Sequence, residues 1–358
     1  MNMLRYAEWF ASRGWTSRVY CVERSPLEKA TASKIPISIV GVNKKAFDYK
    51  NARLVAAQFE QDQLDMVWIS DARDMSTVGI ACKKAGNRPL LVYQQAMQLG
   101  ISKRDLIHTI RFRRIEVWIT LLSYLYNQIS ERTRMDMNRV HEIPLGIDLS
   151  KIDKGLTKIS SRGSFKLPPE GCLLGVIGRF DPLKGQLFVI GALRKLHDLG
   201  IRAHLLLVGE STRGEGQDYE KQLVGLTKQL GLDQFVHIRP FIEDVERFYA
   251  AVDVCVVPSA GETFGMVTIE AMSAGCAVIG TNTSGTPEIL GHGEYGMVYT
   301  PNDLDEFVKK AVRLCKDERL RTAFGLKAAQ VVKEKYDLAK VMDATEELLL
   351  QEIEKKNK

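Results

Sequence analysis

Short apolar runs alternate with longer amphipathic stretches along almost the whole chain. Residues 173–177 are apolar throughout, as expected of a strand covered on both faces, and residues 252–257 and 276–280 also resemble strands. Residues 186–199 and 304–316 instead carry apolar side chains at helical spacing. Strands and helices that alternate in this way predict an α/β protein with parallel sheets.

A change in composition divides this pattern into two parts. Residues 151–171 are rich in Lys, Ser, Gly and Pro and have little apolar periodicity, so we interpret them as a linker. A new strand, turn and helix follow directly. The sequence therefore predicts one Rossmann-like domain over residues 1–165 and a second over residues 166–339, with the helix at about 340–358 completing the first.

The first domain is predicted to begin in a helix over residues 2–13, with Gly14 as its stop. An α/β domain normally opens with a strand and a turn before its first helix. Either this domain starts unusually, or its N-terminal strand and loop precede the recorded sequence.

Composition limits the classes of protein to which this chain can belong. With 358 residues, 45% hydrophobic and 26% charged, the chain has material for two cores, and no apolar run approaches the roughly 18 residues of a membrane span. The six cysteines form no CxxC motif and no Cys/His pairing, which predicts reduced thiols in a cytoplasmic protein without a metal site. The net charge of +6 favours an anionic ligand, an acidic membrane surface or an ordinary solvated surface with a basic excess, and nothing resembles a nucleic-acid module.

Residues 103–114 are basic and also contain apolar residues at helical spacing. They favour either an ordinary half-exposed helix or a peripheral contact with the anionic inner face of a membrane.

Two motifs follow strands of the second domain. The loop from Gly178 to Gly185 carries Arg179 and Lys184 where a parallel strand ends, the position at which open α/β sheets bind ligands. The alternative is a solvated loop with incidental charges. Two cations at a strand exit could neutralise a diphosphate.

The second motif places Glu262 before, and Glu270 inside, an apolar helix that opens at Gly265. A helix N-terminus after a glycine-containing turn binds anions through its unpaired N–H groups. Glu262 could simply cap that helix, and Glu270 could pair with a local basic residue. Two carboxylates beside an anion site are better explained by a ligand that carries phosphates together with sugar hydroxyls.

These residues resemble a known family. The loop Gly178–Gly185, the strand end at Gly209 and the segment from Glu262 to Gly275 look like the donor-binding half of retaining GT-B glycosyltransferases of family 4. Residues 143–148 resemble the end of that family's first domain, so the resemblance covers nearly the whole chain. It implies a GT-B fold, with two Rossmann-like domains that face a central cleft.

The resemblance also implies roles for individual residues. Arg179 and Lys184 would hold the diphosphate and stabilise the leaving group, and Glu262 would bond hydroxyls of the transferred sugar. Glu270 would hold the ribose. The backbone near Pro240 and Phe241 would meet the base, and the backbone at Gly265, Met266 and Val267 would meet the phosphates. The remaining donor-binding positions are Gly178, Gly209 and Phe264.

Two departures from the family concern the acceptor side. The family's first strand and Gly-rich loop do not precede Met1, and the strand at residues 90–93 ends in Gln94 and Gln95, where many members carry a His. A glutamine can donate a hydrogen bond but cannot take a proton at neutral pH.

We therefore expect a retaining hexosyltransferase that uses a UDP- or GDP-sugar and a glycan or lipid-linked acceptor, without a cofactor, in surface polysaccharide or glycolipid biosynthesis. A catalytically impaired nucleotide-sugar binder and a nucleotide-sugar epimerase of the same fold are the alternatives.

Overall fold

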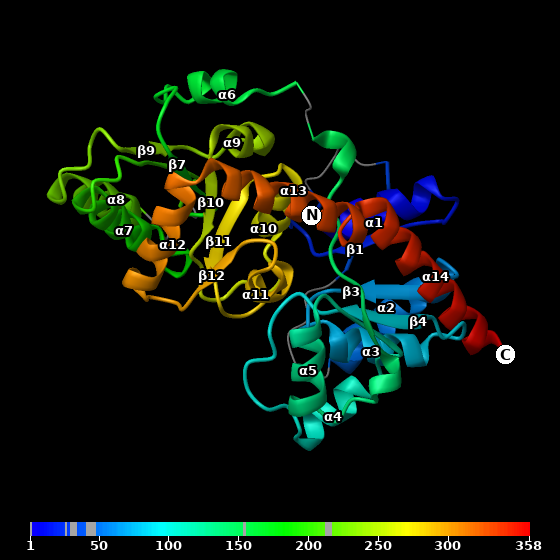
Figure 1. Cartoon of the computed structure of the whole chain (residues 1–358). Coiled ribbons are helices and arrows are strands. Elements are labelled where there is room, and N and C mark those ends of the chain that lie inside the picture. The colour runs from blue at the N-terminus through cyan, green and yellow to red at the C-terminus, as the bar shows by residue number, and fades with distance from the viewer. Residues whose placement is uncertain (1, 26, 29–33, 41–47, 153–154, 212–216) are drawn as a thin grey trace. The chain divides into compact units, whose positions relative to one another are not determined.

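The structure is a computed structural model that describes residues 2–25, 27–28, 34–40, 48–152, 155–211 and 217–358 (Figure 1). The chain divides into two compact units. The first comprises residues 1–121, 125–142 and 347–358, and the second comprises residues 122–124 and 143–346.

The first unit contains parallel strands. Strands β1 (Val19–Cys21) and β2 (Ile37–Ile39) form a pair, and four further strands form a sheet in the order β3-β4-β5-β6. The bounds of these four strands are Met66–Ile69, Leu90–Gln94, Val117–Thr120 and Val140–Glu142. Their parallel register confirms the predicted sheet type.

Helices surround these strands, and α1 (Asn2–Ser12) confirms the helix predicted at the start of the sequence. The other helices that contribute to this unit are α2 (Tyr49–Gln61), α3 (Met75–Lys84), α4 (Leu106–Phe112), α5 (Ser123–Arg132) and the last residues of α14 (Leu338–Asn357). The core contains Phe59, Leu91 and Trp118, each at most 2% exposed.

The second unit is built on a six-stranded parallel sheet in the order β12-β11-β10-β7-β8-β9. The strands are β7 (Leu173–Ile177), β8 (His204–Val208), β9 (Val236–Arg239), β10 (Val254–Val257), β11 (Ala277–Thr281) and β12 (Met297–Tyr299). The chain moves from β7 to β8 on one side and returns to β10 on the other. This reversal creates the crevice at which doubly wound sheets bind ligands.

Helices cover both faces of this sheet (Figure 1). One face packs against α7 (Gln186–Asp198), α8 (Gln217–Gln229) and α12 (Leu304–Lys316). The other packs against α9 (Val245–Ala251), α10 (Met266–Ser273) and α13 (Glu318–Lys335). Each β-strand of the sheet centre is therefore apolar on both sides, as the sequence predicts for residues 173–177.

The segment predicted as a linker contains a helix, α6 (Lys158–Ser164). Its Arg162 is only 2% exposed and donates from Nη2 to Asp253 at 2.6 Å, while its Nε donates to the carbonyl of Ala251. The division between units accordingly falls near residue 143 and not at residue 166. Apolar periodicity does not indicate this helix, because a buried ion pair anchors it in place of apolar side chains.

Candidate functional site

The loop after β7 brings two cations to the β7–β10 crevice of the second unit. Arg179 follows Gly178 directly, and Lys184 ends the short 3-10 helix η3 (Pro182–Lys184). Asp181 caps η3 by accepting a hydrogen bond from the N–H of Leu183 at 2.9 Å. The loop therefore has a defined conformation that presents both cations at the end of the strand.

Two glycines allow close backbone approaches in this region. Gly185 has φ of 71°, and a Cβ there would lie 2.9 Å from the carbonyl oxygen of Pro258. A Cβ on Gly209 would lie 2.0 Å from the carbonyl oxygen of Gly178. Larger residues do not fit at either position, because both contacts are with backbone atoms. The approach at Gly185 brings the Lys184 loop against the segment that follows β10.

The predicted cations are each paired with an acid. Lys184 Nζ lies 2.5 Å from Glu262 Oε1, with the two side chains 32% and 19% exposed. Arg179 Nη2 lies 3.0 Å from Asp181 Oδ2. The structure thus brings together Lys184 and Glu262, which are 78 positions apart in the sequence. Both partners remain partly accessible to solvent.

Helix α10 begins beside this ion pair. Gly265 is its N-cap with φ of 85°, and this residue has no side chain to cap the helix. Met266 and Val267 form its first turn, and Phe264 is 4% exposed beneath it. An uncapped helix N-terminus offers N–H groups and a positive dipole end to an anion.

Glu270 lies one turn further along α10. Its Oε2 accepts a hydrogen bond of 2.8 Å from the hydroxyl of Tyr249, which is 3% exposed in α9. Burial, followed by the charge of Glu270, holds the pKa of Tyr249 well above its ordinary value. The tyrosine therefore retains its proton and acts as a donor to the carboxylate.

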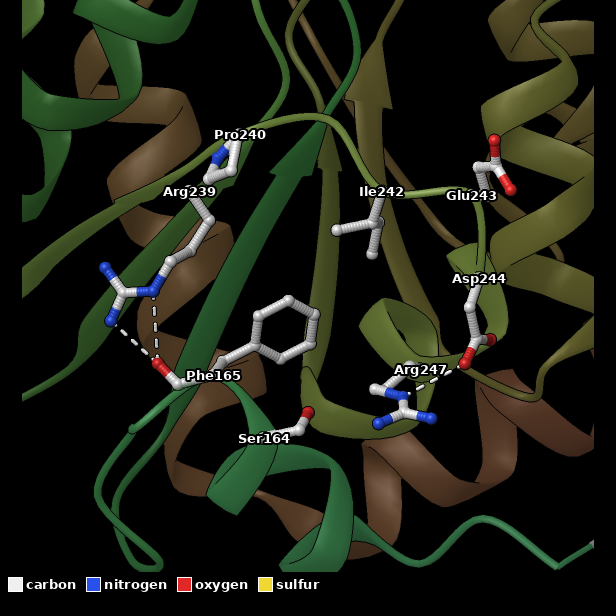
Figure 2. Close-up of a pocket in the computed structure, with 8 residues that line it drawn as sticks. All are labelled: Ser164, Phe165, Arg239, Pro240, Ile242, Glu243, Asp244 and Arg247. Carbon is white, nitrogen blue, oxygen red and sulfur yellow. Dashed lines mark hydrogen bonds and ion pairs between the residues drawn. The ribbon is translucent and has the colours of Figure 1, made fainter.

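The exit of β9 borders a hollow of about 540 Å³ (Figure 2). Pro240 is among its lining residues, whereas Phe241 is 58% exposed. Arg239 donates from Nε and Nη2 to the carbonyl of Phe165 at 3.1 and 2.7 Å, and Arg247 pairs with Asp244 at 3.0 Å. Both guanidinium groups of the hollow are therefore engaged within the protein.

The predicted acceptor-side residues lie in the first unit. Gln94 ends β4 and donates to the hydroxyl of Tyr6 at 3.4 Å. Gln95 is fully buried, donates to the carbonyl of Met97 at 2.9 Å and accepts from Trp118 Nε1 at 3.2 Å. Both ends of the Gln95 amide therefore have partners within the protein.

Three residues of the site were not predicted from the sequence. Asp181 pairs with Arg179, and the buried Gln186 donates to the Arg179 carbonyl at 2.9 Å. Tyr249 holds Glu270 from another helix. A polar residue at the start of an apolar helix could have pointed to Gln186, but the sequence carries no signal for the Tyr249 contact.

Two further observations concern metals and membranes. The described residues contain no cluster of three or more His, Cys, Asp or Glu side chains that could hold a metal ion. Among the helices of the described ranges, none is both long enough and apolar enough to span a bilayer.

Solved structures share this fold over nearly the whole chain. A glycosyltransferase from Rickettsia africae ESF-5 has a TM-score of 0.88 at 17% identity, covering 98% of this chain and 93% of that one. HepE of Anabaena in complex with UDP has a TM-score of 0.86 at 21% identity, covering 98% and 95%. The fold is therefore that of GT-B glycosyltransferases, as the sequence predicts.

The second unit matches a known family model. Residues 158–331 match the family described as Glycosyl transferases group 1. All of the predicted donor-binding residues from Gly178 to Glu270 lie inside the matched segment.

Curated relatives align with only part of their own length. D-inositol 3-phosphate glycosyltransferase of Corynebacterium jeikeium is 30% identical over 193 residues, covering 52% of this chain and 46% of the relative. The same enzyme of Actinosynnema mirum is 29% identical over 204 residues, covering 56% and 49%. The chain thus spans about half the length of the curated relatives it matches.

Proposed function

We propose that this chain acts as a retaining glycosyltransferase of family 4. It moves a hexosyl group from a UDP- or GDP-sugar to an acceptor hydroxyl, in the synthesis of a surface polysaccharide or glycolipid. The observation that carries the proposal is the Lys184–Glu262 ion pair of 2.5 Å beside the N-terminus of α10, within the segment that matches Glycosyl transferases group 1.

A nucleotide sugar would use both members of this pair. Its diphosphate would bind Lys184, Arg179 and the first N–H groups of α10, while hydroxyls of the sugar would donate to Glu262. When the donor binds, its diphosphate would replace Glu262 as the partner of Lys184, and its sugar hydroxyls would replace Lys184 as the partner of Glu262. Neither charge is then left without a partner.

The same geometry supports the departure of the nucleotide. Negative charge grows on the diphosphate as its bond to the anomeric carbon breaks. Cations and dipoles that are already fixed at that position stabilise the transition state more than the ground state. Arg179, Lys184 and the helix end of α10 supply such groups. Glu270 would hold the ribose, and the backbone near Pro240 and Phe241 would meet the base.

The acceptor side belongs to the first unit in this proposal, with Gln94 and Gln95 as candidate residues. Helix α4 supports the further proposal of a peripheral contact with an anionic membrane. Leu106, Ile107 and Ile110 are 70%, 56% and 41% exposed, and Arg104 and Arg113 are also exposed. Exposed apolar side chains flanked by cations are typical of interfacial helices.

Co-sedimentation with phosphatidylglycerol vesicles tests the membrane contact. The wild type should bind, and the double variant Leu106→Ser/Ile107→Ser should lose most of that binding. The control Leu326→Ser changes an exposed leucine of α13 (70% exposed) and should bind like the wild type. Equal binding by the α4 double variant and this control would exclude α4 as the contact.

Thermal unfolding with a panel of UDP- and GDP-sugars tests the donor site. A donor at 100 times its Kd should raise the free energy of unfolding by about 2.7 kcal/mol, because it binds only the native state. Product analysis by NMR with the selected donor should then show an unchanged anomeric configuration.

Other outcomes distinguish the alternatives. Stabilisation by a donor without any transfer would favour an impaired binder, and an altered sugar on the recovered nucleotide would favour an epimerase. An inverted anomeric product would exclude retention. No stabilisation by any member of the panel would exclude the proposed donor site.

A further inference from the structure

Tyr249 and Glu270 form a hydrogen bond between two helices of the second unit. The hydroxyl of Tyr249 in α9 lies 2.8 Å from Oε2 of Glu270 in α10. The tyrosine is 3% exposed, and Glu270 is partly exposed. One end of the contact is therefore fixed in the core, while the other borders solvent.

The protein core holds the tyrosine in place. Its ring contacts that of Phe248 edge to face at a centroid distance of 5.2 Å, and its backbone carbonyl accepts a hydrogen bond from Cys276 Sγ at 3.0 Å. Cys276 directly precedes β11, so the tyrosine is tied to the sheet as well as to α9. A side chain anchored in this way provides a rigid donor.

A glutamate side chain has three rotatable bonds and loses conformational freedom when it binds a ligand. A donor that orients the carboxylate beforehand reduces this cost. Because Glu270 lies between the fully buried residues Ile269 and Ala271, its carboxylate can reach only a limited region at the helix surface.

We propose that Tyr249 is a positioning residue for nucleotide binding. It holds the carboxylate of Glu270 in the orientation in which this carboxylate accepts hydrogen bonds from the ribose hydroxyls. This inference rests on the proposed function, because it assigns the ribose to Glu270. It adds to that function a residue that sets the affinity for the ribose without touching the ligand.

The variant Tyr249→Phe tests this role, since it removes the hydroxyl and keeps the ring. Calorimetry is performed with whichever of UDP and GDP binds the wild type more tightly, and with its 2′,3′-dideoxy analogue. The variant should lose roughly tenfold in affinity for the ribonucleotide and almost nothing for the dideoxy analogue. The KM for the sugar donor should rise by a similar factor at unchanged kcat, because the ribose is remote from the reacting bond.

A matched control is Tyr299→Phe. Tyr299 is 1% exposed in β12 of the same unit, so the control removes another buried tyrosine hydroxyl. It should leave both affinities unchanged. Thermal unfolding of both variants establishes that they are folded at the temperature of the binding experiment.

Each contrary result has a separate meaning. Equal losses for both nucleotides in Tyr249→Phe, or no loss for either, would overturn the positioning role alone. Equal affinity of the wild type for both nucleotides would overturn the assignment of Glu270 to the ribose, and the inference with it. Failure of the wild type to bind UDP or GDP would overturn the proposed function itself.

Discussion

The exit of β4 in the first unit and the exits of β7 and β10 in the second both carry polar side chains, but these make different contacts. Gln95 is fully buried and uses both ends of its amide within the first unit. Lys184 and Glu262 are charged, partly exposed and paired with each other. Neutral buried amides therefore fix a local structure, whereas an accessible ion pair can exchange its partner for a ligand.

Two glycines of the second unit reinforce this difference. In the second unit, Gly185 and Gly209 permit backbone approaches that a Cβ would block, and these bring separate strand exits together. The polar groups of the second unit therefore converge from several strands. Those at the end of β4 are bonded to neighbouring residues of their own unit. This comparison predicts that changes at Lys184 and Glu262 affect binding and turnover, and that changes at Gln95 affect stability.

The largest effect is expected for Lys184→Ala. Loss of a fixed cation at the leaving group should lower kcat by about 10²–10³-fold, measured as nucleotide release in a transfer assay. The control Lys195→Ala removes an ion pair with Asp305 of 2.6 Å from the same unit, and its kcat should be unchanged. Near-normal turnover of Lys184→Ala would remove this residue from the mechanism.

Glu262→Ala should impair transfer more than nucleotide binding. The affinity for the sugar donor should fall about tenfold or more, whereas the affinity for the bare nucleoside diphosphate should be retained, because Lys184 loses its competing partner. Calorimetry with both ligands measures the difference. Equal losses for the two ligands would contradict the assignment of Glu262 to the sugar.

Gln95→Met tests the opposite side of the comparison. The substitution keeps the volume but leaves the Met97 carbonyl and the Trp118 indole N–H without their partner, at a cost of about 2–4 kcal/mol in the free energy of unfolding. Chemical denaturation measures this loss. The exposed Gln61 provides the control Gln61→Met, which should be nearly neutral. A stable Gln95→Met variant with abolished transfer would instead support an acceptor-side role for Gln95.

The smallest effect is the pH dependence of stability that is expected from the histidines of β8 and β9. His204 Nδ1 lies 3.2 Å from His237 Nε2, and burial, followed by the charge of His204, lowers the pKa of His237 to about 4. The unfolded chain binds a proton near pH 6.5, so stability should fall by on the order of 1–3 kcal/mol as the pH decreases from about 6.5 towards 4.

Urea denaturation of the wild type and of His237→Gln at pH 7 and pH 5 measures how the free energy of unfolding changes with pH. The variant should be less sensitive to pH, while His292→Gln, at an exposed position, should behave like the wild type. If the free energy of unfolding of His237→Gln depended on pH as strongly as that of the wild type, His237 would not be the source of this pH dependence.

Much of the fold could be predicted from the sequence because its signals are local. The apolar run at residues 173–177 is covered on both faces, and the helix at the N-terminus lies where its spacing indicates. The site loops were recognisable because glycines and charges follow strands directly. Helix α6 was not predicted, because its buried residues are Ser161 and Arg162 and not apolar side chains.

The sequence by itself determined the order of strands and helices and the positions at which charged loops leave the sheet, because periodicity and turn chemistry act between near neighbours. Only the tertiary structure decided which of these groups meet. Lys184 meets Glu262 across 78 positions and Tyr249 meets Glu270 across 21, because β7 and β10 are neighbours in the sheet and α9 and α10 pack on the same face. Strand order and helix packing are global properties, and no local pattern specifies them.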